Sequence, residues 1–487
     1  MNPNRLFVAS CISLIASAFS FVIRQDVLPA WGTTFGLNAG QLGFIAGLAF
    51  WGMASSMAVG SFVVDFLGMK KMLGLAFLCH LVGTLLTITC PFIATGESAY
   101  RLLCFATFLV GSGNGLVEIG INPLAATLYP TEKTHKLNVL HAWWPGGLFL
   151  GGLISILITK GLGLDAVGAD IKKEAIMFGW QVKVGLIFIP TLIYGVLFMI
   201  QKFPVTERVA SGVSSGEMLG QVARPMFLLW AFCMLLTAST ELAPQGMQSL
   251  VLEKTAGING TYVLMGTSAI MFVLRHFAGP IAHRLSPVGM LTGSSILSAI
   301  GLYALSFAYD TPTVIVAATI FGLGIVYFWP TMLGVTAERF PRGGAFLLGL
   351  MGCIGNLAIG FVSPEMGKIN DKITYEALPA NLRSAVVATA AAEPGKAEGA
   401  AKVEGEKVAA FVIDAEKVKA LPEADRAIVL KAQSEGAKWS FRYVSALPVI
   451  LVFIFGAIAL SDKARGGYKP EVLKGSEFAP AELASDF

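Results

Sequence analysis

Long apolar runs, separated by short polar stretches, cover most of the chain. About twelve of these runs contain roughly 20 or more residues, which is long enough for a helix to cross the ~30 Å hydrocarbon layer of a bilayer. Their approximate ranges are 6–32, 39–64, 70–94, 101–128, 138–159, 179–201, 225–249, 261–283, 287–308, 312–337, 343–366 and 441–461. The pattern predicts an all-α membrane protein with about twelve transmembrane helices.

The first run also has features of a secretory signal peptide, because Arg5 precedes it and Ala16 to Ala18 resemble a cleavage site. The run continues well beyond Ala18, and an even number of spans requires it. We therefore expect a first transmembrane helix, with the signal peptide as the alternative.

Composition and charge agree with a bilayer protein. Only 14% of the residues are charged, which is too few to cover a soluble globule of 487 residues. If the N-terminus is cytoplasmic, most basic residues of the short loops lie on the cytoplasmic side, as the positive-inside rule requires. These residues are Lys70, Lys71, Lys133, Lys136, Lys202, Arg208, Arg284, Arg339 and Arg342. We expect a multi-pass inner-membrane protein with both termini in the cytoplasm, and the net charge of +4 gives no indication of nucleic-acid binding.

Motifs of enzymes and metal sites are missing from the sequence. The six cysteines lie inside apolar runs without CxxC spacing, so they are expected to pack in the interior. The sequence contains no HExxH or P-loop motif. We expect neither an enzyme nor a bound metal or cofactor.

The chain divides into two similar halves. A polar stretch at 202–224, predicted to be a cytoplasmic linker, separates six spans in 1–201 from six in 225–461. Gly111, Gly113 and Pro130 have the same mutual spacing as Gly322, Gly324 and Pro341. This repetition indicates two six-helix bundles with a ligand site between them, although chance agreement of common membrane-helix residues is the alternative.

Two polar segments lie outside this pattern. Residues 367–440 contain an Ala-, Glu- and Lys-rich insert that the topology places outside the cell, where short surface helices or a mobile segment are expected. A lid over the outer mouth is a further hypothesis for it. Residues 462–487 are expected to form a cytoplasmic tail.

The segment GSFVVDFLGMKK, which follows the second run, resembles the loop signature of the major facilitator superfamily. It departs from that signature at Ser61 and Phe66. We interpret it as a conformational latch, with a solvated loop carboxylate as the alternative. The latch residues are Asp65, Gly68, Lys70 and Lys71.

Three carboxylates inside apolar runs are candidate proton-coupling groups, because a charge at the bilayer centre costs about 3 kcal/mol or more. Glu118 shares one helix face with Asn114 and Asn122. Asp26 is two residues from Arg24, which places the two on nearly opposite faces. Glu241 shares a face with Gln245 and Gln248. A structural ion pair with Arg24 or Arg275 is the alternative for Glu118.

Several segments resemble the fucose:proton symporter branch of the major facilitator superfamily. They are IRQDVLPAW, GLVEIGINPLAATLYP, HKLNVLHAWWPGGLFLGGL, TASTELAPQGMQ and VLRHFAGPIAHRL. The resemblance implies that Asp26 and Glu118 serve substrate engagement and proton coupling, and that Glu241 matches an acidic position of the seventh helix. A carboxyl group removed from water can take up and release a proton at the pH of the cell, which is compatible with this role.

A sugar needs buried hydrogen-bonding groups and an apolar surface on which its ring stacks. The candidate substrate-binding residues are Asn114, Asn122, His141, Trp144, Gln245, Gln248, Tyr327, Trp329 and Asn356. Packing or interfacial anchoring is the alternative for each aromatic residue, and a hydrogen-bonded core histidine or a proton relay is the alternative for His141.

The sequence thus predicts a secondary active transporter that takes up a monosaccharide with protons by alternating access. A monomer is expected, with the small solute, protons and the lipid bilayer as its partners. An exporter or carrier of another metabolite or drug is one alternative, and a non-transporting membrane sensor is another.

Overall fold

The structure, a computed structural model, describes residues 1–164, 171–256, 260–388, 412–413 and 415–473. Within these ranges the side chains of residues 39, 246–261, 364, 384, 387–388, 412–413, 415–416 and 419 are not described.

Helices long and apolar enough to cross a membrane dominate the described residues. Eleven meet this condition, and a twelfth is obtained if the bent pair α11 and α12 is counted as one span. The predicted all-α class with about twelve membrane helices is therefore confirmed.

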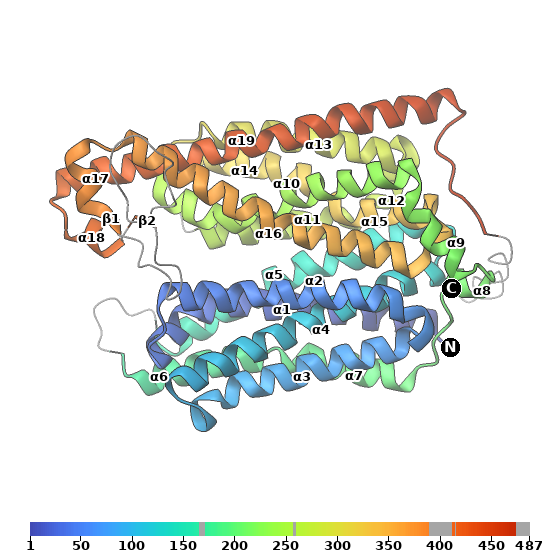
Figure 1. Ribbon diagram of the computed structural model, residues 1–487, viewed down its shortest axis with the longest axis horizontal. Helices are drawn as coiled ribbons and strands as arrows, with labels where there is room; N and C mark the ends of the chain where they lie inside the picture. The colour runs from blue at the N-terminus through green and yellow to red at the C-terminus, as the bar shows by residue number, and fades with distance from the viewer. Residues whose placement is uncertain (165–170, 257–259, 389–411, 414, 474–487) are drawn as a thin grey trace.

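The first group of helices comes from the N-terminal part of the chain and forms the lower layer in Figure 1. Helices α2 and α3 pack extensively against α4, while α1 packs against α5 and α7. The members are α1 (Pro3–Phe35), α2 (Ala39–Leu67), α3 (Met69–Ile93), α4 (Gly96–Leu128), α5 (Lys133–Gly161), α6 (Lys173–Gly185) and α7 (Phe188–Ile200).

The second group forms the upper layer in Figure 1. Helix α13 packs against α14 and α19, and α16 packs against α10 and α19. The members are α10 (Pro225–Ala256), α11 (Gly260–Arg275), α12 (Ala278–Leu285), α13 (Pro287–Leu305), α14 (Thr311–Ile325), α15 (Phe328–Arg339), α16 (Gly344–Ala377) and α19 (Glu423–Ala464). Contacts of α5 with α11 and of α2 with α16 join the two groups, so the fold is two six-helix bundles.

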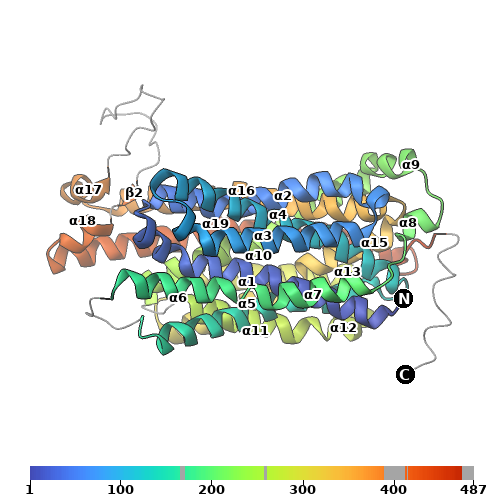
Figure 2. The ribbon, with the colours of Figure 1, turned by 90° about the horizontal axis from the view of Figure 1, so that it is seen from below.

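The two ends of the molecule differ. Between the bundles the chain forms the short elements α8 (Glu207–Ala210), α9 (Ser215–Gly220) and η1 (Gln221–Ala223). They lie at the end where α1 begins and α19 finishes (Figures 1 and 2). We call this the linker end and the opposite end the insert end.

Three spans are interrupted near their middle. Helix α6 passes into α7 around Leu186, α14 passes into α15 around Tyr327, and α11 meets α12 at a bend of 66°. Backbone groups freed by such breaks are tolerated where they face other protein groups. The α14–α15 and α11–α12 breaks adjoin the central site described below.

Small residues bring α2 and α4 into close contact. A Cβ atom at Gly111 would lie 2.2 Å from the carbonyl oxygen of Ala49, and one at Gly52 would lie 2.3 Å from that of Phe108. Any side chain at either position would therefore force the helices apart.

The described residues of the insert form short helices, which was one of the two expectations for this segment. Helix α16 continues eleven residues beyond the expected limit of 366, and α19 begins at Glu423 instead of 441. Between them lie α17 (Ala380–Val386), a two-residue antiparallel pair of β1 (Val387–Ala388) with β2 (Val412–Ile413), and α18 (Ala415–Ala420). A small apolar core holds these parts together, formed by Leu378, Leu382, Val386, Val418, Val429 and Ala432. The polar composition concealed this core because its apolar residues are few and widely spaced.

Candidate substrate and proton site

Glu118 lies in α4 at the interface of the bundles and is only 4% exposed. Its Oε2 accepts a hydrogen bond from Asn122 Nδ2 at 2.7 Å, and Asn122 Oδ1 lies 2.9 Å from His141 Nε2. The amide oxygen is an acceptor, which assigns the proton of the neutral ring to Nε2. His141 Nε2 is also 3.7 Å from Glu118 Oε2, and among the described residues no other basic nitrogen lies within 4 Å of this carboxylate.

Arg275, at the end of α11, holds the opposite side of the site and is 2% exposed. Its Nη2 donates to Glu241 Oε1 at 3.1 Å, its Nη1 to the carbonyl oxygen of His141 at 2.8 Å, and its Nε to that of Val326 at 2.6 Å. Glu241 Oε2 also accepts from the backbone N–H of Trp329 at 3.3 Å. One guanidinium therefore neutralises Glu241 and connects the two bundles.

Two prolines explain why these carbonyl oxygens are available. Pro145 follows His141 by four residues, and Pro330 follows Val326 by four residues. Proline has no N–H, so the carbonyl oxygen four residues earlier has no partner within its helix. Arg275 supplies the missing donors at both places, one in each bundle.

The predicted aromatic residues take different positions. Tyr327 is buried at the break between α14 and α15, where its hydroxyl donates to the carbonyl oxygen of Leu274 at 2.9 Å. Trp329 is buried two residues further along the chain, beside Glu241. Trp144 is partly exposed on α5, with its ring 5.9 Å from that of Phe21. Tyr327 and Trp329 thus join the central cluster, and Trp144 lies against α1.

The predicted amides are also divided. Asn356 donates to the carbonyl oxygen of Gly352 at 2.9 Å and reaches Met57 Sδ of the other bundle at 3.5 Å. Gln245 Nε2 lies 3.7 Å from Met271 Sδ. The side chain of Gln248 lies outside the described residues.

Asn114 is directed away from this cluster, into the interior of the first bundle. Its Oδ1 is 2.8 Å from His80 Nε2, and its Nδ2 donates to Ser20 Oγ at 3.1 Å. His80 Nδ1 in turn lies 2.9 Å from the hydroxyl of Tyr194. The i, i+4, i+8 spacing grouped Asn114 with Glu118 and Asn122. Because each four-residue step rotates the side chain by about 40°, Asn114 lies about 80° from Asn122 around the helix and faces α3.

Asp26 lies toward the insert end and does not reach the central cluster. Its Oδ2 is 2.5 Å from Lys183 Nζ of α6 and accepts from Ser155 Oγ at 2.7 Å. The Asp26 side chain is 38% exposed. As its spacing predicted, Asp26 makes no ion pair with Arg24, because its partner is Lys183.

At the linker end, α5 and α15 close the interface between the bundles. Lys133 Nζ binds Glu207 Oε2 at 2.6 Å and donates to the carbonyl oxygen of Ala337 at 3.3 Å. The backbone N–H of Thr134 donates to Glu338 Oε1 at 2.9 Å. Deeper in the interface, Asn138 Nδ2 donates to Thr331 Oγ1 at 3.2 Å.

Tyr468, which follows α19, completes this closure by donating to Glu338 Oε2 at 2.6 Å. Burial raises the pKa of the Tyr468 phenol well above its usual value, and the adjacent Glu338 carboxylate raises it further. The phenol is therefore a neutral donor at physiological pH.

Two of the four predicted latch residues form side-chain contacts with neighbouring elements. Asp65 accepts from Arg208 Nε at 2.7 Å and from Thr206 Oγ1 at 2.6 Å. Lys70 Nζ donates to the carbonyl oxygens of Met199 and Gln201 at 2.8 Å, where it stabilises the C-terminal end of α7.

The other two latch residues do not form side-chain contacts of this kind. Gly68 separates α2 from α3 and has φ 83°, a conformation that favours glycine, while Lys71 is exposed. Asp65 is thus tied to the linker helix α8 through Arg208.

Two bundles of membrane-length helices meet at a buried polar cluster, an arrangement typical of membrane transport proteins. A sequence model of the Major Facilitator Superfamily matches residues 6–363. The chain therefore belongs to the major facilitator superfamily and is a multi-pass membrane transporter.

Solved structures of this superfamily share the fold. The E. coli fucose:proton symporter FucP is 15% identical with a TM-score of 0.64, and the match covers 92% of this chain and 98% of that one. The proton:xylose symporter XylE bound to 6-bromo-6-deoxy-D-glucose is 11% identical with a TM-score of 0.68, covering 93% and 95%. At identities this low, the structural similarity shows a common fold and nothing further.

A relative found by sequence comparison is named as an anion transporter, whereas the two solved structures are sugar symporters. The "Probable anion transporter 3, chloroplastic" of Arabidopsis thaliana is 26% identical over 212 residues. The match spans 43% of this chain and only 38% of the length of that relative.

Sequence reasoning missed the central position of Arg275 and the pairing of Lys183 with Asp26. Arg275 was considered only as an ion-pair partner of Glu118, whereas it pairs with Glu241. The prolines four residues after His141 and Val326 were the available signal, because each leaves a carbonyl oxygen that requires a donor.

Proposed function

We propose that this transporter couples uptake of a small neutral polyhydroxylated solute, a monosaccharide, to the movement of protons. Glu118 is the proton-carrying group in this proposal, and Asn122, His141, Tyr327, Trp329 and Asn356 are the substrate-facing groups. The observation that carries the proposal concerns the two buried carboxylates at the interface: Glu241 forms an ion pair with an arginine and, within the described residues, Glu118 does not.

Glu241 has a permanent countercharge, whereas Glu118 has none. The guanidinium of Arg275 binds Glu241 directly, and the nearest nitrogens to Glu118 belong to the neutral amide of Asn122 and the His141 ring. A buried carboxylate without a cation is costly to keep ionised, so a proton is the natural countercharge in the closed interface. Opening the site to water would remove that cost and allow the proton to leave.

The hydrogen-bonding capacity of the cluster favours a neutral solute over an anion. Arg275 already directs donors to Glu241, Val326 and His141, so its charge and these donors are committed. The remaining groups are amides, an imidazole and aromatic rings, which suit hydroxyl groups and the apolar face of a sugar ring.

Alternating access then follows from the contacts at the linker end. The hydrogen bonds of Lys133, Thr134 and Asn138 to α15 hold that end closed. In the proposed cycle they break when the bundles rock around the central cluster. We also propose, from the positive-inside pattern, that the linker end faces the cytoplasm of a cell with this protein in its inner membrane, that Asp65 with Arg208 forms the latch, and that the transporter acts as a monomer.

Uptake into proteoliposomes tests this function. Purified protein is reconstituted, a pH gradient (acid outside) is imposed, and labelled fucose, xylose, glucose, galactose and inorganic phosphate are compared. Concentrative uptake of one of the sugars, abolished by a protonophore, is expected. Concentrative uptake of phosphate without any sugar uptake would contradict the neutral-solute proposal and favour an anion carrier.

A further inference from the structure

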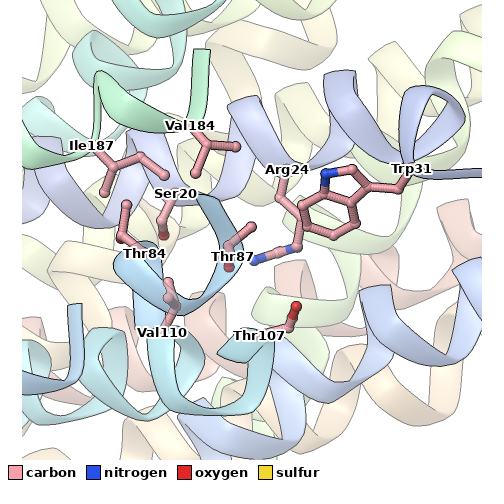
Figure 3. A pocket seen from close by; sticks show the side chains of 9 residues that line it. All are labelled: Ser20, Arg24, Trp31, Thr84, Thr87, Thr107, Val110, Val184 and Ile187. Carbon is pink, nitrogen blue, oxygen red and sulfur yellow. The ribbon is translucent and has the colours of Figure 1, made fainter. Parts of the chain in front are cut away.

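A small cavity inside the first bundle has no place in the transport site described above. It measures about 30 Å³ and lies among α1, α3, α4 and the α6–α7 junction (Figure 3). Hydroxyl groups of Ser20, Thr84, Thr87 and Thr107 line it, together with Arg24 and Trp31. Neither an aspartate nor a glutamate is among the lining residues.

The guanidinium of Arg24 extends from α1 toward Thr87 and Thr107 (Figure 3). Arg24 is 6% exposed, and its Nε and Nη1 are buried without a hydrogen-bond partner. Within the described residues its charge has no carboxylate within 4 Å, and the ring of Phe21 at 5.5 Å is its only charge-stabilising contact of note. A buried, unpaired cation costs several kcal/mol, so a compensating group is expected.

Asp26, which follows Arg24 by two residues in the sequence, already has a partner. Asp26 binds Lys183, which makes that pair neutral and leaves the charge of Arg24 in excess. Two further donors on the cavity lining, the indole N–H of Trp31 and the hydroxyl of Thr84, are buried without a partner. The cavity thus combines one net positive charge with several unused donors.

We propose that this cavity binds one monatomic anion, a halide such as chloride, beside Arg24. The volume accommodates about two water-sized spheres, which favours a monatomic ion over phosphate, a carboxylic acid or a sugar. A halide accepts hydrogen bonds from every direction and donates none, so it matches the unpartnered donors of Arg24, Trp31 and Thr84. A water molecule would leave the charge of Arg24 uncompensated.

The bound halide stabilises the first bundle in the region where α1, α3 and α4 meet. Its binding is independent of proton coupling, because Arg24 and Glu118 share no hydrogen-bond partner in the described structure. The proposal therefore predicts that the thermal stability of the protein depends on which anion is present in solution.

Thermal unfolding of the purified protein in detergent tests the proposal. Sodium chloride or bromide replaces sodium gluconate at constant ionic strength, and the Tm is followed by tryptophan fluorescence. We expect a saturable rise of Tm by roughly a few degrees in either halide, as for any ligand that binds only the folded state. An equal Tm in chloride and gluconate would overturn the proposal.

Two variants locate the effect. Arg24→Gln removes the charge, so its Tm should be insensitive to halide while remaining at least as high in gluconate as that of the unmodified protein. Arg101→Gln, which alters an exposed arginine of α4, should retain the full halide response. A full halide response in Arg24→Gln would place the anion elsewhere and contradict the proposal.

A direct measurement covers the case in which Arg24→Gln does not fold. Crystals of the unmodified protein grown in bromide should give one anomalous peak in the cavity beside Arg24. Well-ordered density for Arg24 with no bromide peak there would refute the site.

Discussion

Arg275 of the second bundle donates a hydrogen bond to the backbone carbonyl oxygen of His141 in the first bundle, with an Nη1–O distance of 2.8 Å. The same guanidinium binds Glu241, and the His141 ring binds Asn122, which in turn binds Glu118. The two buried carboxylates of the interface are therefore connected through three residues. A change at Glu118 has a continuous route of contacts to the opposite bundle.

The first prediction concerns the stability contributed by Arg275. Arg275→Met should lower the free energy of unfolding by about 3–5 kcal/mol, because it leaves Glu241 buried without a cation. Adding Glu241→Gln should recover part of this loss. Arg101→Met, at an exposed ion pair, serves as the control and should change little. Equal unfolding midpoints for Arg275→Met and the control would show that the buried pair is not required.

The second prediction concerns the contact of α2 with α4. Gly111→Ala should lower the free energy of unfolding by about 1–3 kcal/mol, because its Cβ would lie 2.2 Å from the backbone of Ala49. Gly74→Ala is the matched control, since no atom lies within 4 Å of the added carbon. Thermal unfolding of the two variants compares them, and a stable Gly111→Ala would mean that the helices separate without cost.

The third prediction concerns closure of the linker end. Glu338→Ala removes the acceptor for Thr134 and Tyr468, and each lost hydrogen bond contributes about 0.5–1.5 kcal/mol. A cysteine introduced at Thr331, in a Cys104→Ser background, should then react with a water-soluble maleimide roughly tenfold faster. Cys104 is replaced because the other five cysteines are buried.

Glu365→Ala is the control for this measurement, since Glu365 forms an exposed ion pair on α16. It should leave the labelling rate unchanged. An unchanged rate in Glu338→Ala as well would show that Glu338 does not hold the interface closed.

Much of the fold follows from the sequence alone, because the length of apolar runs determines where helices cross the bilayer. The limits of α16 and α19 do not, since both helices extend beyond the apolar run into polar segments, and that of α19 packs in a small core with α17 and α18. Hydropathy distinguishes segments in the bilayer from segments in water. It carries little information about whether a helix continues from the bilayer into water.

The central site is only partly predictable. Intramembrane position identified Glu118 and Glu241, because burial of a carboxylate is costly wherever its partner lies. The partner itself depends on which helices meet, and the spacing of residues along the chain carries no information about the distance between Arg275 and either acid. Helical spacing also misplaced Asn114, which contacts His80 and Ser20 instead of the interface.

The fourth prediction concerns the latch. Asp65→Asn and Arg208→Gln should each slow transport, and the double variant should be no slower than either single variant, because both break the same 2.7 Å contact. Lys71→Gln, at an exposed position, is the control and should transport normally. Additive losses in the double variant would mean that the two residues act separately.

The most direct test of the account compares two transport modes in Glu118→Gln. Glutamine keeps the shape of the side chain and its contact with Asn122 but cannot exchange a proton. With a sugar that the unmodified protein accumulates, Glu118→Gln should lose accumulation driven by a pH gradient and retain counterflow exchange, whereas Glu97→Gln, at an exposed position of α4, should retain both. Undiminished pH-driven accumulation in Glu118→Gln would contradict the assignment of Glu118 as the proton carrier.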